Sequence, residues 1–211
     1  MQAAGRTALT PVAVTEPAQP AAQVPTTEPP GGTAPRRARG IAVGLLLGVA
    51  VVIVAADALG KQLALTHLTD RDPVRVLGGV LYLDVTRNGG AAFSLGTRYT
   101  IVFPIVTVVV ATWIGWMASR LRSLPWAAAL GLVLGGALGN FADRLLRAPG
   151  FLVGHVVDYL SLFGPNGAHW PIFNIADAAL SCGVVLAVLL ELTGRRRDGG
   201  RVRQTGRRDQ S

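Results

Sequence analysis

Four long apolar stretches dominate the pattern of hydrophobic and polar positions, and they cover residues 41–58, 99–118, 124–145 and 170–192. A helix of about twenty residues is long enough to cross the hydrocarbon core of a bilayer. A buried helix of a soluble protein would show a polar face, whereas segments 106–111 and 184–190 are apolar on every side. The pattern predicts an all-α membrane protein with four transmembrane helices.

A second pattern lies between the first two stretches. Apolar and polar residues alternate strictly over residues 81–86, which is the period of a half-buried strand. Gly78 and Gly79 supply a turn before it, and residues 74–77 supply a partner strand. We therefore expect a small β-sheet in this loop, at the membrane surface.

The two ends of the chain lack such patterns. Residues 1–40 are rich in Pro, Ala and Thr, which predicts a disordered cytoplasmic tail. A signal peptide is the alternative, because small residues at 55–58 imitate a cleavage site, but a forty-residue leader before it is too long. Residues 41–193 then form the transmembrane domain. Residues 194–211 form a basic cytoplasmic tail that contacts anionic lipid headgroups.

The positive charge is sorted by position. The net charge is +8, which alone would allow a nucleic-acid partner, but the arginines cluster at 36–39, 120–122 and 195–208. These clusters flank alternate ends of the four stretches, and basic residues accumulate on the cytoplasmic side of membrane proteins. We therefore expect no nucleic acid partner. Both termini should be cytoplasmic, with the loops 60–98 and 146–169, including the sheet, on the extracytoplasmic side.

Strongly polar residues inside the apolar stretches gather near their outer ends. Ionisable side chains inside a bilayer are costly and mark functional sites. Residues three or four positions apart share one face of a helix, so the members of each helix should face together. The pattern predicts a polar site near the outer leaflet that contains Asp57, Lys61, Asn140, Asp143, Arg144, Asn174 and Asp177.

The neighbours of these groups indicate different roles. Asp57 and Lys61 are four apart and could be a simple ion pair at a helix end. Arg144 beside Asp143 would keep that carboxylate ionised, which favours a role in holding structure or substrate. Asp177 lies among apolar residues, so desolvation favours its protonated form, as a general acid or base requires.

Several chemistries lack their residues. The sequence holds no Gly-x-Ser-x-Gly elbow and no His-Glu-x-x-His pair. Cys182 is the single cysteine, so no thiolate cluster is possible, and its mid-span position beside Ser181, Gly183 and Val184 predicts a packed thiol. We expect no metal and no cofactor. Two carboxyl groups that share one proton remain the best chemistry for this site.

Five motifs follow one another within residues 41–192: Asp57-x-x-x-Lys61, Asn88-Gly-Gly-Ala-Ala-Phe-Ser94, Gly139-Asn140-x-x-Asp143-Arg144, Val157-Asp158-Tyr159 and Phe173-Asn174-x-Ala176-Asp177. In this order and on four predicted spans, they resemble the lipoprotein signal peptidase, or signal peptidase II, family. The stretch 147–154 is longer than is usual in that family, and the two tails lie outside the resemblance.

The resemblance implies an aspartic endopeptidase of the bacterial cytoplasmic membrane, with its active site on the extracytoplasmic side. Such an enzyme removes the signal peptide from prolipoproteins by cleaving before the diacylglyceryl-modified cysteine. The family's catalytic pair falls on Asp158 and Asp177, and Asp158 is singled out by the resemblance alone. Positions that bind substrate or shape the site are Asp57, Lys61, Asn88, Asn140, Asp143, Arg144 and Asn174. The expected partners are lipid-modified prolipoproteins and membrane lipids, and we expect a monomer.

A small transporter or channel with carboxylates near the outer leaflet is the alternative. Transporter sites lie near the bilayer midplane between broken helices. Here the polar groups are displaced outward, with no partner in the inner half apart from the terminal Glu191. The pattern therefore favours the peptidase.

Overall fold

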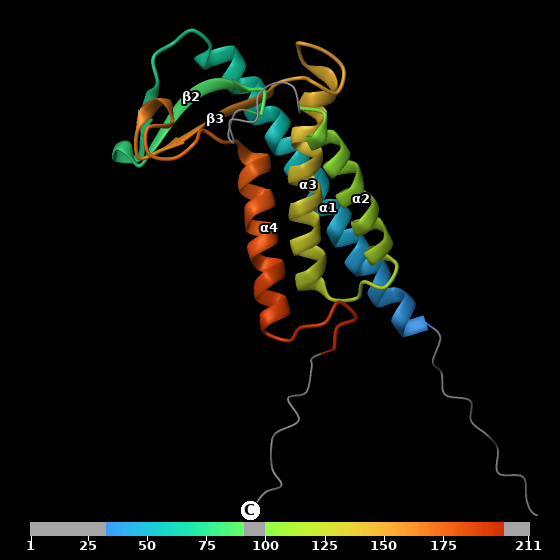
Figure 1. Ribbon diagram of the computed structural model, residues 1–211. Coiled ribbons are helices and arrows are strands. Elements are labelled where there is room, and N and C mark those ends of the chain that lie inside the picture. The colour runs from blue at the N-terminus through green and yellow to red at the C-terminus, as the bar shows by residue number, and fades with distance from the viewer. Residues whose placement is uncertain (1–32, 91–99, 201–211) are drawn as a thin grey trace, which may run out of the picture. The chain divides into compact units, whose positions relative to one another are not determined.

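The computed structural model describes residues 33–90 and 100–200. Ser94, residues 1–32 of the predicted tail and residues 201–211 lie outside this range. The described chain forms four helices and three strands (Figure 1). The helices are α1 (Thr33–Leu68), α2 (Val102–Ala118), α3 (Leu124–Leu146) and α4 (Ile175–Leu192), and the strands are β1 (Val74–Val76), β2 (Leu81–Asn88) and β3 (Val156–Leu162).

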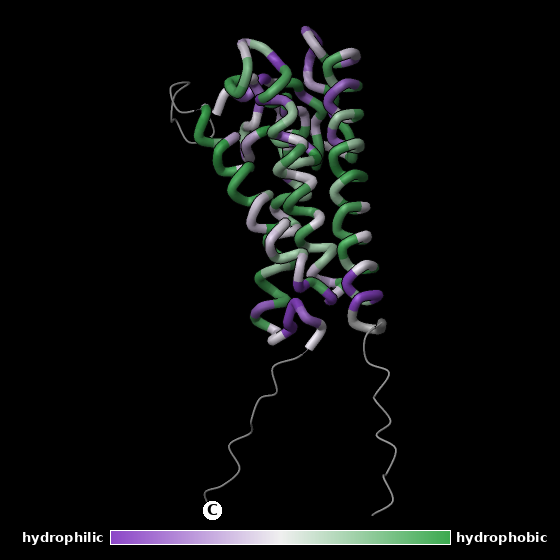
Figure 2. Tube along the Cα trace, turned by 90° about the vertical axis from the view of Figure 1, so that its right-hand side faces the viewer, coloured by the Kyte–Doolittle hydropathy of each residue, from purple (hydrophilic) through white to green (hydrophobic). Residues whose placement is uncertain are grey.

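Three of these helices are long and apolar enough to cross a membrane, namely α1, α3 and α4, while α2 is a shorter apolar helix. Figure 2 shows the hydrophobic band along the bundle, with hydrophilic residues toward both ends. The outward faces expose large apolar side chains, such as Val51 and Val52 on α1, Val109 on α2 and Val185 on α4. A mostly helical membrane protein with a small sheet is therefore confirmed.

The first helix extends beyond the predicted span of 41–58 at both ends. It begins at Thr33, so residues 33–40 are helical and do not belong to an unstructured tail. At about 1.5 Å per residue it is longer than a hydrocarbon core of about 30 Å. Its last turns therefore reach past the other helices to the sheet, where Lys61 and Ala64 are buried.

Small residues let α3 pack closely between its neighbours, as is common in membrane bundles. Gly131 and Gly135 face α1, while Gly136 faces α4. A methyl group added at Gly139 would come within 2.8 Å of the Asp57 carboxylate and 3.1 Å of the Ala176 side chain. Cys182 on α4 is exposed, so the prediction of a packed thiol was wrong. Ser181, Val184 and Val185 beside it are exposed as well, so this face of α4 points outward.

The sheet is antiparallel, in the order β1-β2-β3. The predicted hairpin is confirmed, and its short turn uses positive φ angles at Gly78 and Gly79. Strand β3 was not predicted from the residue pattern. Both of its faces are covered from Val156 to Tyr159, so the alternation that marks a half-buried strand is absent.

The segment before α4 is hydrogen-bonded to the edge of β3. The Leu160 N–H donates to the Phe173 carbonyl at 2.8 Å, and the Phe173 N–H donates to the Leu160 carbonyl at 2.9 Å. This bridge replaces the start of the predicted fourth span, and the helix begins only at Ile175. It also brings the first turn of α4 beside the strand that carries Asp158.

The long stretch 147–154 forms a loop whose two ends are held together by backbone hydrogen bonds. The Gly154 N–H donates to the Arg144 carbonyl at 3.0 Å, and the His155 N–H donates to the Ala148 carbonyl at 2.9 Å. A Cβ atom at Gly154 would overlap the Asp143 carbonyl, so this closure requires glycine. The extra residues therefore form a side loop and do not separate β3 from α3.

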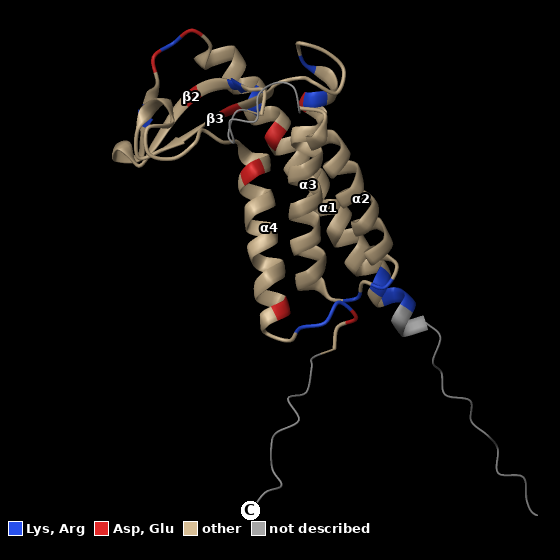
Figure 3. Ribbon diagram, viewed as in Figure 1, with Lys and Arg blue, Asp and Glu red and all other residues tan. Residues whose placement is uncertain are grey.

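At the opposite end of the bundle, the chain after α4 folds back. Within residues 195–200 of the predicted tail, the Arg197 carbonyl accepts hydrogen bonds from the N–H groups of Arg122 and Ser123, which connect α2 to α3. Figure 3 shows arginines gathered at this end, whereas acidic and basic residues are mixed at the end that carries the sheet.

Candidate active site

Asp158 is a buried carboxyl group on β3, with an exposed fraction of 1%. Its two oxygens accept hydrogen bonds from two amide side chains. Asn88 Nδ2, at the end of β2, donates to Oδ2 at 2.9 Å, and Asn174 Nδ2 donates to Oδ1 at 2.7 Å. The carboxyl group is therefore fixed in orientation by the sheet on one side and by the start of α4 on the other.

Asp177 is held at the start of α4 by a capping box. The Asp177 N–H donates to Asn174 Oδ1 at 2.9 Å, and Asp177 Oδ2 accepts from the Asn174 N–H at 3.1 Å. Its other oxygen accepts from Asn140 Nδ2 of α3 at 2.6 Å. The Asp177 side chain is partly exposed, whereas Asp158 is buried, so Asp177 is less enclosed than its apolar neighbours in the sequence suggested.

Two asparagines connect the carboxyl groups. Asn174 Nδ2, which reaches Asp158, also lies 3.0 Å from Asn140 Oδ1, and Asn140 Nδ2 reaches Asp177. Asp158, Asn174, Asn140 and Asp177 thus form one hydrogen-bonded chain drawn from β3, α3 and α4. The arrangement leaves both carboxyl groups in each other's electrostatic range.

The environment of Asp158 favours its protonated form. Burial, together with the nearby charge of Asp177, raises the pKa of Asp158 to about 7. The hydrogen bonds from Asn88 and Asn174 and the charge of Lys61 oppose this rise. A carboxyl group that exchanges its proton near neutral pH beside a second carboxyl group can serve general acid–base chemistry.

Behind this pair lies a buried ion cluster centred on Lys61, whose side chain is 1% exposed. Lys61 Nζ lies 2.6 Å from Asp57 Oδ2 and 2.9 Å from Asp143 Oδ2. It also donates to Asn140 Oδ1 at 3.1 Å. The Asp57–Lys61 pair is therefore more than a helix-end ion pair, because it joins α1 to α3 and to the asparagine chain.

The two acids of the cluster hold the backbone next to each candidate catalytic residue. Asp57 Oδ1 accepts from the Ala176 N–H at 3.0 Å, and Ala176 directly precedes Asp177. Asp143 Oδ2 accepts from the Val157 N–H at 3.1 Å, and Val157 directly precedes Asp158. Lys61 bridges these two anchors, so one ammonium group links the positions of both carboxyl groups.

Arg144 follows Asp143 in the sequence, which suggested that the two would pair, but the structure shows no ion pair between them. Asp143 binds Lys61 and Arg147 instead. The guanidinium of Arg144 stacks over the Phe103 ring at 4.6 Å and donates from Nη1 to the Asn140 carbonyl at 3.3 Å. Its buried Nε has no hydrogen-bond partner within the described residues. The group lies in electrostatic range of Asp158 and Asp177.

All seven polar residues predicted for the outer ends of the helices lie at this site, and so do Asn88 and Asp158, which the family resemblance implied. Arg147 and Phe103 were missed. Arg147 could have been found, because it lies four residues after Asp143 on the same helical face. Phe103 carried no signal, since one aromatic residue among many apolar ones is unremarkable. Over the described ranges, no three His, Cys, Asp or Glu side chains are grouped so as to hold a metal ion.

Comparison with known proteins points to one family. The family model for signal peptidase (SPase) II matches residues 49–193. Proteins called lipoprotein signal peptidase are similar to the chain: that of Mycobacterium avium is 44% identical over 79% of this chain and 89% of its own length. The protein of Streptomyces coelicolor is 42% identical over 79% of each chain. A solved structure of a bacterial membrane enzyme superposes with a TM-score of 0.61 at 31% identity, covering 71% of this chain and 93% of that one.

Proposed function

The chain belongs to the signal peptidase II family and cleaves signal peptides from prolipoproteins, and we propose that Asp158 and Asp177 are its catalytic pair. The hydrogen-bonded chain from Asp158 through Asn174 and Asn140 to Asp177 carries this proposal. The cleavage occurs before the diacylglyceryl-modified cysteine.

In the proposed reaction, the pair holds one proton between two carboxyl groups. Burial favours that proton on Asp158, while the N-terminal turn of α4 favours negative charge on Asp177. Asp177 removes a proton from a water molecule as the water attacks the scissile carbonyl carbon. Asp158 gives its proton to the carbonyl oxygen. The proton on Asp177 then passes to the leaving amide nitrogen as the C–N bond breaks, and Asp158 recovers its proton from the collapsing diol.

The remaining polar residues position this chemistry. Asn88 and Asn174 orient Asp158, and Asn140 orients Asp177. Arg144, with a buried N–H that lacks a partner among the described residues, binds a carbonyl group of the substrate peptide. Asp57, Lys61 and Asp143 hold the backbone beneath the pair. No step requires a metal, so a chelator should leave the rate of cleavage unchanged.

The protein is a multi-pass protein of the bacterial inner membrane, and we infer that α2 also crosses the bilayer, giving four spans. If both termini are cytoplasmic, the arginine-rich end of the bundle in Figure 3 lies on the cytoplasmic side, as the positive-inside rule requires, and the candidate site faces the extracytoplasmic side. Reporter fusions after Gly194 and within the loop 146–169 test this orientation. They should report opposite sides of the membrane, and reports from the same side would contradict it.

Cleavage by the purified protein is the direct test of function. The protein is incubated with a diacylglyceryl-modified prolipoprotein, and the shortened product is measured by mass spectrometry. A substrate with that cysteine replaced by alanine is the matched control and should remain intact. Equal cleavage of both substrates would contradict the proposed specificity, and cleavage of neither would contradict the function.

The alternative of a transporter or channel gains nothing from the structure. Lys61 pairs with Asp57 at 2.6 Å and with Asp143 at 2.9 Å, so these two carboxylates are not free to bind a transported cation.

A further inference from the structure

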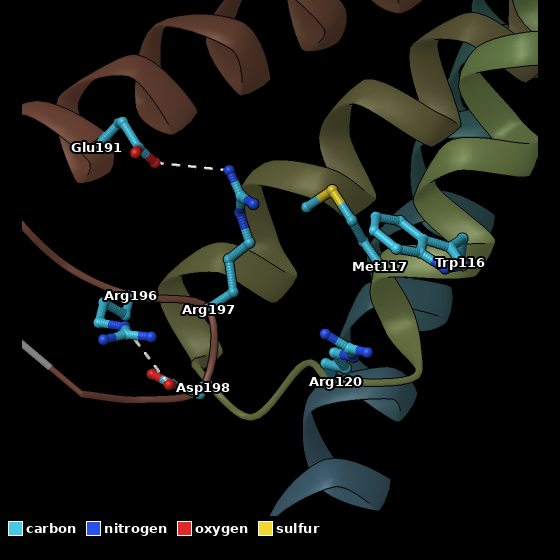
Figure 4. A pocket seen from close by; sticks show the side chains of 7 residues that line it. All are labelled: Trp116, Met117, Arg120, Glu191, Arg196, Arg197 and Asp198. Atoms are coloured by element: carbon cyan, nitrogen blue, oxygen red, sulfur yellow. Dashed lines mark ion pairs between the residues drawn. The ribbon is translucent and has the colours of Figure 1, made fainter.

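A polar cavity lies at the end of the bundle opposite the sheet, where α2 and α4 end. Its volume is about 330 Å³, and Figure 4 shows the side chains that line it. Three of them are arginines that come from two separate segments of the chain. The lining residues are Trp116, Met117, Arg120, Glu191, Arg196, Arg197 and Asp198.

One wall of the cavity is held in place by hydrogen bonds. The N–H groups of Arg122 and Ser123 donate to the Arg197 carbonyl at 2.9 and 3.0 Å. Trp126 Nε1, on a side chain only 3% exposed, donates to the Arg195 carbonyl at 2.7 Å. The Arg197 guanidinium also stacks over the Trp126 ring at 4.9 Å. The segment after α4 is therefore docked on the start of α3, and Arg197 is preorganised.

The charges in the cavity are available to an incoming anion. Arg197 lies 3.5 Å from Glu191, and Arg196 lies 3.5 Å from Asp198. All four of these side chains are largely exposed, and exposed pairs of this kind are weak. Arg120 makes no ion pair within the described part of the chain. Three guanidinium groups against two carboxylates leave a net positive site, and guanidinium binds phosphate with two parallel hydrogen bonds.

The apolar part of the lining distinguishes between possible anions. Trp116 is 64% exposed, and it continues the apolar outward face of α2 that includes Val109 and Trp113. A free phosphate ion needs only the guanidinium groups. A phospholipid needs cations for its headgroup and an adjacent apolar face for its acyl chains, and tryptophan is enriched at that level of a membrane. The cavity offers both.

We propose that this cavity binds an anionic phospholipid, with Arg120 and Arg197 on the headgroup phosphate and the acyl chains along the exposed face of α2. The site is separate from the candidate catalytic pair, since it lies at the opposite end of the same helices. Its ligand is a structural lipid of the surrounding leaflet and does not take part in the cleavage reaction.

Lipid retention measured by native mass spectrometry tests the proposal. The full-length protein in detergent is incubated with phosphatidylglycerol or with the zwitterionic phosphatidylcholine. We expect the wild-type protein to retain about tenfold more phosphatidylglycerol than phosphatidylcholine. The double variant Arg120→Gln with Arg197→Gln should lose most of this preference. Arg122→Gln with Arg195→Gln is the matched control. It removes two exposed arginines of the same end that do not line the cavity, and it should retain the preference.

Three results would overturn the proposal. Equal losses in the two double variants would mean that the general positive field of this end attracts lipid. Equal retention of the two lipids would mean that the headgroup charge is not selected. Displacement of phosphatidylglycerol by millimolar inorganic phosphate would mean a plain anion site. Arg120→Gln alone removes an exposed side chain that makes no ion pair with the described residues, so it guards against misfolding and should still lower retention. Prolipoprotein cleavage confirms that each variant is folded.

Discussion

The two ends of the helix bundle use ionic groups in opposite ways. At the sheet end, Lys61 lies 2.6 and 2.9 Å from two carboxylates, and all three groups are buried. At the other end, the pairs Arg197–Glu191 and Arg196–Asp198 are exposed and 3.5 Å long. Buried ions are tolerated only when they are fully paired, so the first cluster fixes a geometry. The exposed pairs at the other end contribute charge to the protein surface.

The buried and the exposed ion pairs differ because the two ends of the bundle position different groups. The buried cluster binds the backbone N–H groups of Val157 and Ala176, which position Asp158 and Asp177. Preorganised groups of this kind lower the barrier of a reaction because they need no rearrangement when charge develops. The arginine-rich end lies away from the proposed catalytic pair. Its charge suits orientation in the membrane and the binding of lipid.

The largest effect on stability should come from Lys61→Met. It leaves Asp57 and Asp143 buried without their counter-charge, and breaking a buried ion pair in this way costs about 3–5 kcal/mol. Denaturant unfolding in detergent micelles measures the loss. Adding Asp57→Asn and Asp143→Asn to Lys61→Met should recover part of it, since no carboxylate then remains unpaired. A single variant within about 1 kcal/mol of wild type would show that the cluster is not a stabilising centre.

A smaller effect is expected for Asp143→Asn. The amide keeps one oxygen for the Val157 N–H but loses its charge toward Lys61 and Arg147. Stability should fall by about 1–3 kcal/mol, the cost of an unsatisfied buried group. Because the change acts through position, KM should rise by a larger factor than kcat falls. Steady-state kinetics separates the two, and a pure loss of kcat would instead place Asp143 in the chemical step.

The pH dependence of stability should reveal Asp158. Its pKa is raised to about 7 in the folded protein, so between the unfolded pKa and 7 the folded state holds a proton that the unfolded state has released. This contribution is fully present at low pH and is lost as pH rises through 7, with a slope of up to about 1.4 kcal/mol per unit. In Asp158→Asn this slope should disappear. Parallel curves for the variant and wild type would contradict the assignment.

Activity should depend on pH through the same proton. The pair needs one proton, so the rate should follow a bell, and its alkaline limb should pass near pH 7. The two limbs describe the coupled pair and belong to neither residue alone. A rate that stays flat well above neutral pH would rule out a shared proton.

The smallest effect should come from Glu191→Gln at the arginine-rich end. Its partner Arg197 is 3.5 Å away, and the Glu191 side chain is 70% exposed. Exposed pairs contribute less than about 1 kcal/mol, so unfolding in micelles should barely change. If Glu191→Gln lowered the free energy of unfolding as much as Lys61→Met does, the two ends would not differ in how their ion pairs contribute to stability.

The sequence predicted those parts of the protein that a local pattern encodes. Long apolar runs predicted the helices, alternation predicted the β1–β2 hairpin, and the outer polar residues predicted most of the site. Strand β3 escaped because both its faces are buried, and with it Asp158 could be found only through the family resemblance. The extent of α1 escaped because hydropathy marks the part inside the lipid and not the polar turns beyond it.

Pairings between distant residues were the least predictable part. Asp143 and Arg144 are adjacent in sequence, but neighbouring residues on a helix point in different directions. Asp143 therefore meets Lys61 of another helix and Arg147 one turn on, while Arg144 turns to Phe103. Asp158 is more buried than Asp177 because of the way β3 packs against α3 and α4. No sequence pattern within β3, α3 or α4 alone contains that information.

The central claim is that Asp158 and Asp177 act as one catalytic unit. Its most direct test is the rate of prolipoprotein cleavage by Asp158→Asn, by Asp177→Asn and by the double variant, each checked for folding. Asparagine keeps the shape but cannot carry the shared proton, so each single variant should lose at least about 10³-fold in rate. The double variant should be little worse, as is usual for groups that act together. Full activity in Asp177→Asn would contradict the account, and so would an inactive Asp143→Asn beside an active Asp158→Asn.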